Sequence, residues 1–155
     1  MKFEQYQNLK ALAISRCKEE GKEYPDPKGI NPIVLAYIGD IVFSTYVRLR
    51  ILPNSSQVRV LHDLSAKMVS AVCQAKAMRT LVAELTEEEA GVYHRGRNAK
   101  SMVPKSASVQ EYREATAFEA LIGYLFLSDM QDRCEEMMEK AFQTIITHCE
   151  LRITH

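Results

Sequence analysis

Two acidic residues stand alone in the two most apolar stretches of this 155-residue chain. Asp40 is the only charged residue in segment 30–47, and Glu119 is the only one in segment 115–127. An ionised carboxylate in apolar surroundings is unfavourable unless a proton, a hydrogen-bond donor or a cation compensates its charge. Each acid could therefore be a hydrogen-bonded core residue, or both could be oxygen ligands of a hard cation such as Mg²⁺.

A second feature is the basic segment, residues 90–110, which contains no acid. It carries four cations and several small polar residues, and the candidate contacts to a polyanion are Arg95, Arg97, Asn98, Lys100 and Lys105. Forked guanidinium donors, ammonium groups and free backbone amides are what phosphate oxygens bind. A solvated loop has the same composition, so composition alone leaves both interpretations open.

Apolar residues recur at spacings of three and four along nearly the whole chain, which predicts an all-helical fold. A first helix is expected over about residues 3–20, followed by a Pro- and Gly-rich linker over about 21–30. Asn31 and Pro32 are typical of a helix start, and Pro53 stops the helix that follows them near Arg50.

Further along the chain, segment 57–85 is expected to form one short and one long helix. The capping pair Thr86 and Glu89 begins another helix, which ends near Gly96. Two more are expected over about 109–127 and 129–151. The expected buried stripe of segment 57–85 consists of Leu61, Leu64, Met68, Val69, Val72 and Met78.

Two glycines lie inside the helices that carry the lone acids. Gly39 and Gly123 each weaken a helix by about 1 kcal/mol relative to Ala, which is tolerated where two backbones or a ligand must approach closely. We therefore expect these two helices to meet and to bring Asp40 and Glu119 around one Mg²⁺ ion, which accepts one or two carboxylates and completes its shell with water and phosphate oxygens.

The composition excludes several other classes. Twenty basic and twenty acidic residues give no net charge, so attraction to a polyanion must be local. The start lacks a secretory signal, Asp40 and Glu119 interrupt the best candidates for a membrane span, and the four cysteines are scattered. We expect one soluble cytoplasmic domain with reduced thiols, no zinc motif and no glycine-rich nucleotide loop.

The motifs LAYIGDIVFSTYVR and TAFEALIGYLFL resemble the two signature helices of the ribonuclease III catalytic domain. The similarity extends through RGRNAKS and YREATAFEA, and the length without a double-stranded-RNA-binding domain resembles the Mini-ribonuclease III branch. The resemblance implies a single ribonuclease III-like domain over residues 1–155. It also implies a homodimer that cuts double-stranded RNA with Mg²⁺ and leaves 5′-phosphate and 3′-hydroxyl ends.

The Mini branch matures the ends of precursor 23S ribosomal RNA, so the resemblance implies that substrate and leaves open whether a ribosomal protein shapes it. Asp40 and Glu119 would match the metal-binding catalytic acids of the family. Ala36 and Thr116 stand where larger members carry two further acids, so one or two metal ions remain possible.

Two other functional classes fit parts of the sequence. One is a catalytically silent relative that binds structured RNA in a ribosomal particle, and the other is a helical dimerisation adaptor. The apolar surface expected for the adaptor consists of Tyr37, Phe43, Tyr46 and Val47. A silent relative has no need of either lone acid, so the presence of both favours the enzyme.

Overall fold

The computed structural model describes residues 2–99, 108–149 and 151, and the chain divides into two compact units, 1–30 and 31–155. The first unit contains helix α1 (Lys2–Glu19) and a 3₁₀ turn, η1 (Pro27–Gly29). Gly21 ends α1 with φ of 78°, a left-handed conformation that favours glycine. The predicted first helix and the linker after it agree with these bounds to within one residue.

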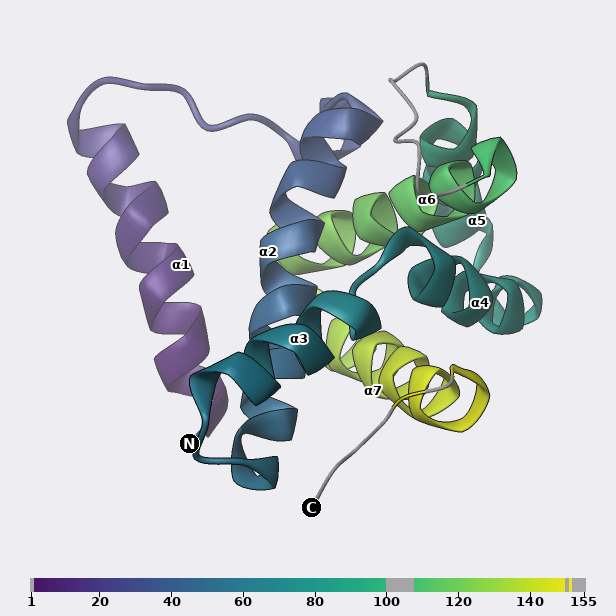
Figure 1. The fold of residues 1–155 in the computed structure, drawn as a ribbon. Helices are drawn as coiled ribbons and strands as arrows, with labels where there is room; N and C mark the ends of the chain where they lie inside the picture. Colours follow the sequence, from purple (N-terminus) through teal and green to yellow (C-terminus); the bar gives the residue numbers. More distant parts are fainter. Residues whose placement is uncertain (1, 100–107, 150, 152–155) are drawn as a thin grey trace. The chain divides into compact units, whose positions relative to one another are not determined.

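The second unit contains six α-helices and two 3₁₀ turns in its described residues, and Figure 1 shows how they are arranged. In chain order they are α2 (Pro32–Ile51), η2 (Leu52–Asn54), α3 (Val58–Met68), α4 (Ala71–Leu81), η3 (Val82–Glu84), α5 (Glu87–Asn98), α6 (Val109–Leu127) and α7 (Gln131–His148). The described residues include no strand, which confirms the all-α prediction.

Side-chain caps set several of these helix starts. The Asn31 side chain accepts a hydrogen bond from the amide of Ile33 at 2.8 Å, with Pro32 at the first helical position. The predicted capping box of Thr86 and Glu89 is present at α5, and Ser108 starts α6 with a second box that the sequence analysis did not identify.

Segment 57–85 forms two helices as predicted, but the prediction that one is short and the other long was wrong. α3 and α4 have eleven residues each, and the chain breaks between them because the Ser70 hydroxyl caps α4 by accepting from the amide of Cys73. Of the predicted stripe, Leu64, Met68 and Met78 are buried. The other members, Leu61, Val69 and Val72, are only half-buried.

Helix α6 is the centre of the second unit, since α2, α4, α5 and α7 all pack against it (Figure 1). The rings of Phe43 and Phe118 meet edge to face between α2 and α6, with their centroids 4.9 Å apart. Glu119 follows Phe118 directly, so the packing of the ring also fixes the position of that acid.

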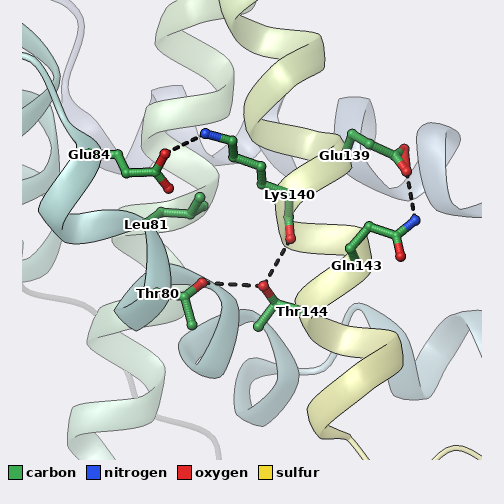
Figure 2. Close-up of a pocket in the computed structure, with 7 residues that line it drawn as sticks. All are labelled: Thr80, Leu81, Glu84, Glu139, Lys140, Gln143 and Thr144. Carbon is green, nitrogen blue, oxygen red and sulfur yellow. Dashed lines mark hydrogen bonds and ion pairs between the residues drawn. The ribbon is translucent and has the colours of Figure 1, made fainter.

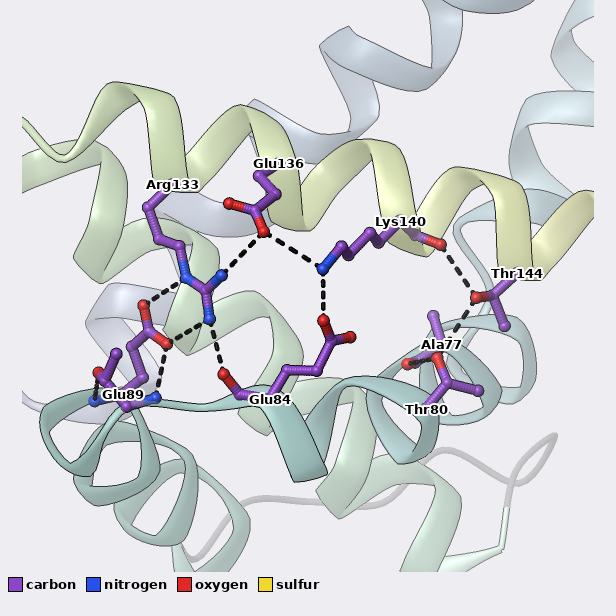
Figure 3. Close-up of polar contacts among 9 residues, drawn as sticks. Ala77, Thr80, Glu84, Glu89, Arg133, Glu136, Lys140 and Thr144 are labelled. Carbon is purple, nitrogen blue, oxygen red and sulfur yellow. Dashed lines mark hydrogen bonds and ion pairs between the residues drawn. The ribbon is translucent and has the colours of Figure 1, made fainter.

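Helix α7 is tied to the start of α5 by a buried ion pair (Figure 3). The guanidinium of Arg133 donates to both carboxylate oxygens of Glu89, at 2.8 and 2.9 Å, and to the backbone oxygen of Glu84 at 2.9 Å. It also pairs with Glu136 one turn further along α7. These contacts fix the capping-box end of α5 to the opposite side of the core.

The expectation that no segment is long and apolar enough to cross a membrane was wrong by the criteria of length and composition. Residues Pro32–Asn54 meet both criteria, with a mean hydropathy of 1.3 and a third of their most apolar window buried. The charged residues of this segment, Asp40, Arg48 and Arg50, are too few to offset its many aliphatic residues. The core helix of a soluble protein meets the same criteria, and α2 is packed along α6.

Candidate active site

Helices α2 and α6 cross in backbone contact at two glycines. A Cβ atom on Gly39 would lie 1.7 Å from the backbone oxygen of Glu119, and one on Gly123 would lie 2.0 Å from that of Leu35. No side chain fits at either position, so both glycines are required for the crossing as it stands. The predicted close approach of the two helices is confirmed.

The crossing brings the two lone acids together. Glu119 is half-buried and Asp40 is exposed, and their side chains lie close enough for a hydrogen bond when one of them carries a proton. Burial, the hydrogen bond and the negative charge of Asp40 together raise the pKa of Glu119 to about 9. With its pKa raised to about 9, Glu119 holds a proton near neutral pH when no cation is bound.

The chemistry of this pair fits a magnesium ion. A cation between the two carboxylates would replace the shared proton and compensate both charges. Within the described residues no group of three or more His, Cys, Asp or Glu side chains is placed to hold a metal, so this part of the chain offers the two acids alone at the crossing. Mg²⁺ is commonly held by one or two carboxylates, with water and substrate phosphates in the other positions.

The two departures from the larger family members lie beside this pair without adding ligands. Ala36 is 8% exposed and has no polar side-chain atom. Thr116 is 6% exposed, and its hydroxyl donates to the backbone oxygen of Tyr112 at 2.9 Å. The described neighbourhood therefore contains only the two predicted acids.

The predicted RNA-binding residues of the basic segment differ in their surroundings. Arg95 and Asn98 are exposed at the end of α5, and Arg95 forms no ion pair within the part of the chain that the structure describes. Arg97 is paired with Glu114 of α6, with 2.7 Å between Arg97 Nε and Glu114 Oε1. Lys100 and Lys105, the other two predicted contacts, lie outside the described residues.

Glu114 and its second partner, Tyr93, were not among the site residues predicted from the sequence. The Tyr93 hydroxyl is within hydrogen-bond distance of both Glu114 oxygens, and burial together with this carboxylate raises the pKa of Tyr93 to about 12. A usable signal was present, because Glu114 lies four and seven residues before Phe118 and Leu121, on the buried side of α6. An acid in that phase requires a buried partner.

The apolar surface predicted for a dimerisation adaptor needs correction. Phe43 and Val47 are fully buried in the core, while Tyr37 is 73% exposed. The exposed apolar face of α2, called here the α2 stripe, consists of Val34, Tyr37, Ile41 and Leu49. Asp40 lies between Tyr37 and Ile41 in sequence, so the stripe begins beside the acid pair.

Comparisons with known proteins identify the family of this chain. The Ribonuclease III domain matches residues 33–130. Mini-ribonuclease 3 of Brevibacillus brevis is 44% identical over 122 residues, covering 77% of this chain and 91% of the relative, and that of Thermoanaerobacter sp. is 43% identical over 118 residues, covering 75% and 83%.

A crystal structure of a protein from Fusobacterium nucleatum superposes with a TM-score of 0.70 at 25% identity, covering 74% of this chain and 96% of that one. Residues 33–130, which the Ribonuclease III domain matches, contain helices α2 to α6 apart from the first residue of α2, and include both acids of the crossing. The chain therefore belongs to the ribonuclease III family of endoribonucleases and, within it, to the Mini-ribonuclease 3 branch.

Proposed function

We propose that the protein is a Mg²⁺-dependent endoribonuclease that cleaves double-stranded RNA and uses Asp40 and Glu119 as metal ligands. The products would carry 5′-phosphate and 3′-hydroxyl ends. The observation that supports this best is that Asp40 and Glu119 interact directly at the backbone crossing of α2 and α6. Membership of the family supplies the reaction class.

The two acids have unequal environments, which suggests unequal tasks. Asp40 is exposed and accessible to a phosphate-bound ion, while the half-buried Glu119 holds the proton of the metal-free pair. A bound Mg²⁺ ion would supply Lewis acidity toward the scissile phosphate and lower the pKa of a water molecule. The two carboxylates would hold and orient the metal ion, and the backbone contact between α2 and α6 would keep the carboxylates in place.

RNA binding would come from the exposed end of α5 and the rest of the basic segment, namely Arg95, Arg97, Asn98, Lys100 and Lys105. Duplex RNA is recognised mainly through its phosphates and 2′-hydroxyls rather than its base sequence. Contacts of this kind weaken as salt rises, because phosphate binding releases counterions. We therefore expect RNA binding to depend more on the shape of the duplex than on its base sequence, and to weaken at high salt.

A homodimer would bury the α2 stripe. Four large apolar side chains, each more than half exposed, lie on one helix that also carries Asp40. Exposed large apolar side chains that gather on one helix are typical of an interaction surface. Pairing two copies there would bring the two acid pairs near one interface, as cleavage of both strands of a duplex requires.

The cellular substrate that we propose is precursor 23S ribosomal RNA in the cytoplasm. This assignment rests on the likeness to Mini-ribonuclease 3 relatives, which are bacterial. A ribosomal protein that shapes the precursor would be a natural partner, since this chain's own basic surface is small. Comparison of cleavage of naked precursor and of assembling particles would identify such a requirement.

The test of the activity is cleavage of a duplex RNA by wild type, Asp40→Asn and Asp63→Asn, with and without Mg²⁺. Asp63 is an exposed acid of α3 outside the crossing, so its variant controls for the loss of one negative charge. We expect wild type and Asp63→Asn to cut only with Mg²⁺ and Asp40→Asn to be inactive. Duplex binding without cleavage by wild type would instead indicate a silent RNA-binding module.

A further inference from the structure

Glu114 lies buried between α6 and α5, where it holds the one arginine of the basic segment that is not fully solvated. Its side chain is 8% exposed and bonds to the Tyr93 hydroxyl at 2.8 Å and to Nε of Arg97 at 2.7 Å. The Arg97 side chain is 41% exposed. Within the described residues, Nε is the nitrogen of this guanidinium that has a hydrogen-bond partner, and the two terminal nitrogens have none.

The backbone around this contact is closely packed. A Cβ atom on Gly96 would lie 2.9 Å from the Cα atom of Ala117, so α5 rests directly on α6 one residue before Arg97. Glu114 and Ala117 are one turn apart on α6. The helix that carries Glu119 therefore also sets the position of the Arg97 side chain.

We propose that Glu114 is a positioning residue that orients Arg97 for a backbone phosphate of duplex RNA. The carboxylate accepts a hydrogen bond from Nε of Arg97. The two terminal nitrogens then form a fixed pair of donors directed away from the core. Holding the fork before binding removes part of the entropy loss of ordering a long side chain on the RNA. This inference rests on the proposed function and assigns a role to a residue outside the basic segment.

Positioning and simple electrostatics predict opposite signs for the same substitution. Glu114→Gln removes a negative charge near the RNA surface, which by charge alone would tighten binding. If Glu114 orients Arg97, the weaker amide partner frees the guanidinium and binding weakens. The direction of the change therefore distinguishes the two explanations.

The chain contains a matched control for this substitution. Glu139 on α7 is contacted by Tyr46 and by Arg50, whose Nη1 lies 2.9 Å from Glu139 Oε1, so a second Tyr, Glu and Arg set exists away from the basic segment. Figure 2 shows Glu139 on α7 with its neighbour Gln143. Glu139→Gln changes the net charge by the same amount and should leave RNA binding unchanged or slightly tighter.

The experiment measures binding of a duplex RNA without Mg²⁺, and kcat and KM with it, for wild type, Glu114→Gln, Glu139→Gln and Arg97→Ala. We expect Glu114→Gln to raise Kd and KM by about three- to tenfold with kcat changed less than about twofold. Adding Glu114→Gln to Arg97→Ala should produce no further loss, because both act through one guanidinium.

Arg97→Lys provides a second variant that does not disturb the buried acid. Lysine keeps the charge but lacks the forked donors of a guanidinium. Its ammonium group should pair with Glu114, so the variant should bind RNA about as weakly as Arg97→Ala. Two outcomes overturn the positioning role: Arg97→Lys binds RNA as tightly as wild type, or Glu114→Gln has a Kd no higher than that of Glu139→Gln. In either case, binding of duplex RNA by the wild-type protein still supports the proposed function. Failure of wild type to bind duplex RNA overturns both.

Discussion

The backbone oxygen of Glu119 occupies the space that a side chain at Gly39 would need, since a Cβ atom there would lie 1.7 Å from that oxygen. The residue before Asp40 thus touches the backbone of the residue that carries the other acid. The distance between the two helix backbones beside the acids is therefore set by direct contact between α2 and α6.

Gly39→Ala should separate the helices and disable the site. Helix backbone cannot yield as a side chain does, so we expect a loss of about 2–4 kcal/mol in the free energy of unfolding, together with loss of cleavage under conditions where the variant is folded. Chemical denaturation and an RNA cleavage assay measure the two effects.

Gly91→Ala is the control, because its Cβ would meet only the Arg95 side chain, at 3.4 Å. Because this glycine lies inside a helix, the substitution should raise the free energy of unfolding by about 0.5–1 kcal/mol, and the variant should keep its cleavage activity. Equal behaviour of the two variants would contradict a special role for the crossing.

The raised pKa of Glu119 predicts how metal binding depends on pH. Near neutral pH the metal-free pair holds a proton that Mg²⁺ must displace, so apparent Mg²⁺ affinity should increase as pH rises from about 7 toward 9. Titration of Mg²⁺ against cleavage rate at several pH values measures this dependence. An affinity that does not change over this range would show that Glu119 is already ionised.

The same group should affect the stability of the metal-free protein. An acid whose pKa is higher when folded stabilises the fold below its unfolded pKa of about 4.5, and that contribution is lost as pH rises toward about 9. Glu119→Gln should therefore be more stable than wild type at pH 8 by about 1–3 kcal/mol and nearly equal to it at pH 4. Saturating Mg²⁺ should reduce the difference by stabilising wild type alone.

Sequence reasoning identified the two acids and the two glycines because each is a local exception to the pattern around it. It did not identify the partner of Arg97, because Glu114 lies seventeen residues further along the chain on another helix. The basic segment was judged by its own composition, which contains no acid, whereas tertiary packing supplies one from α6. The relative lengths of α3 and α4 were predicted wrongly because a single serine cap, and no Gly or Pro, marks the break between the two helices.

The α2 stripe predicts a dimer that a charge should disrupt. Ile41→Lys places an ammonium group in the middle of the exposed apolar face, where burial without a partner is unfavourable. We expect the variant to be a folded monomer in sedimentation or light-scattering measurements while wild type is a dimer. Val58→Lys, which changes an apolar residue that is 80% exposed outside the stripe, should leave the dimer intact.

Arg133 should contribute to stability without affecting the chemistry. Glu89 is 1% exposed and loses its charged partner in Arg133→Met, which leaves a buried carboxylate bonded only to the cap of α5. Breaking one side of such a pair lowers the free energy of unfolding by about 3–5 kcal/mol. Arg16→Met, which removes an exposed pair with Glu19, should lower it by less than about 1 kcal/mol.

The pH dependence of this pair has the opposite sign to that of Glu119. Burial opposes the charge of Glu89, but the hydrogen bonds from Arg133 and from the Thr86 backbone exceed that effect and lower its pKa below 4.5. Its contribution is therefore complete above about pH 4.5 and is lost as pH falls through the lowered pKa. Thermal unfolding of wild type and Arg133→Met should show the two curves far apart at pH 7 and converging in acid, and curves that stay parallel into acid would contradict an ionised Glu89 in the core.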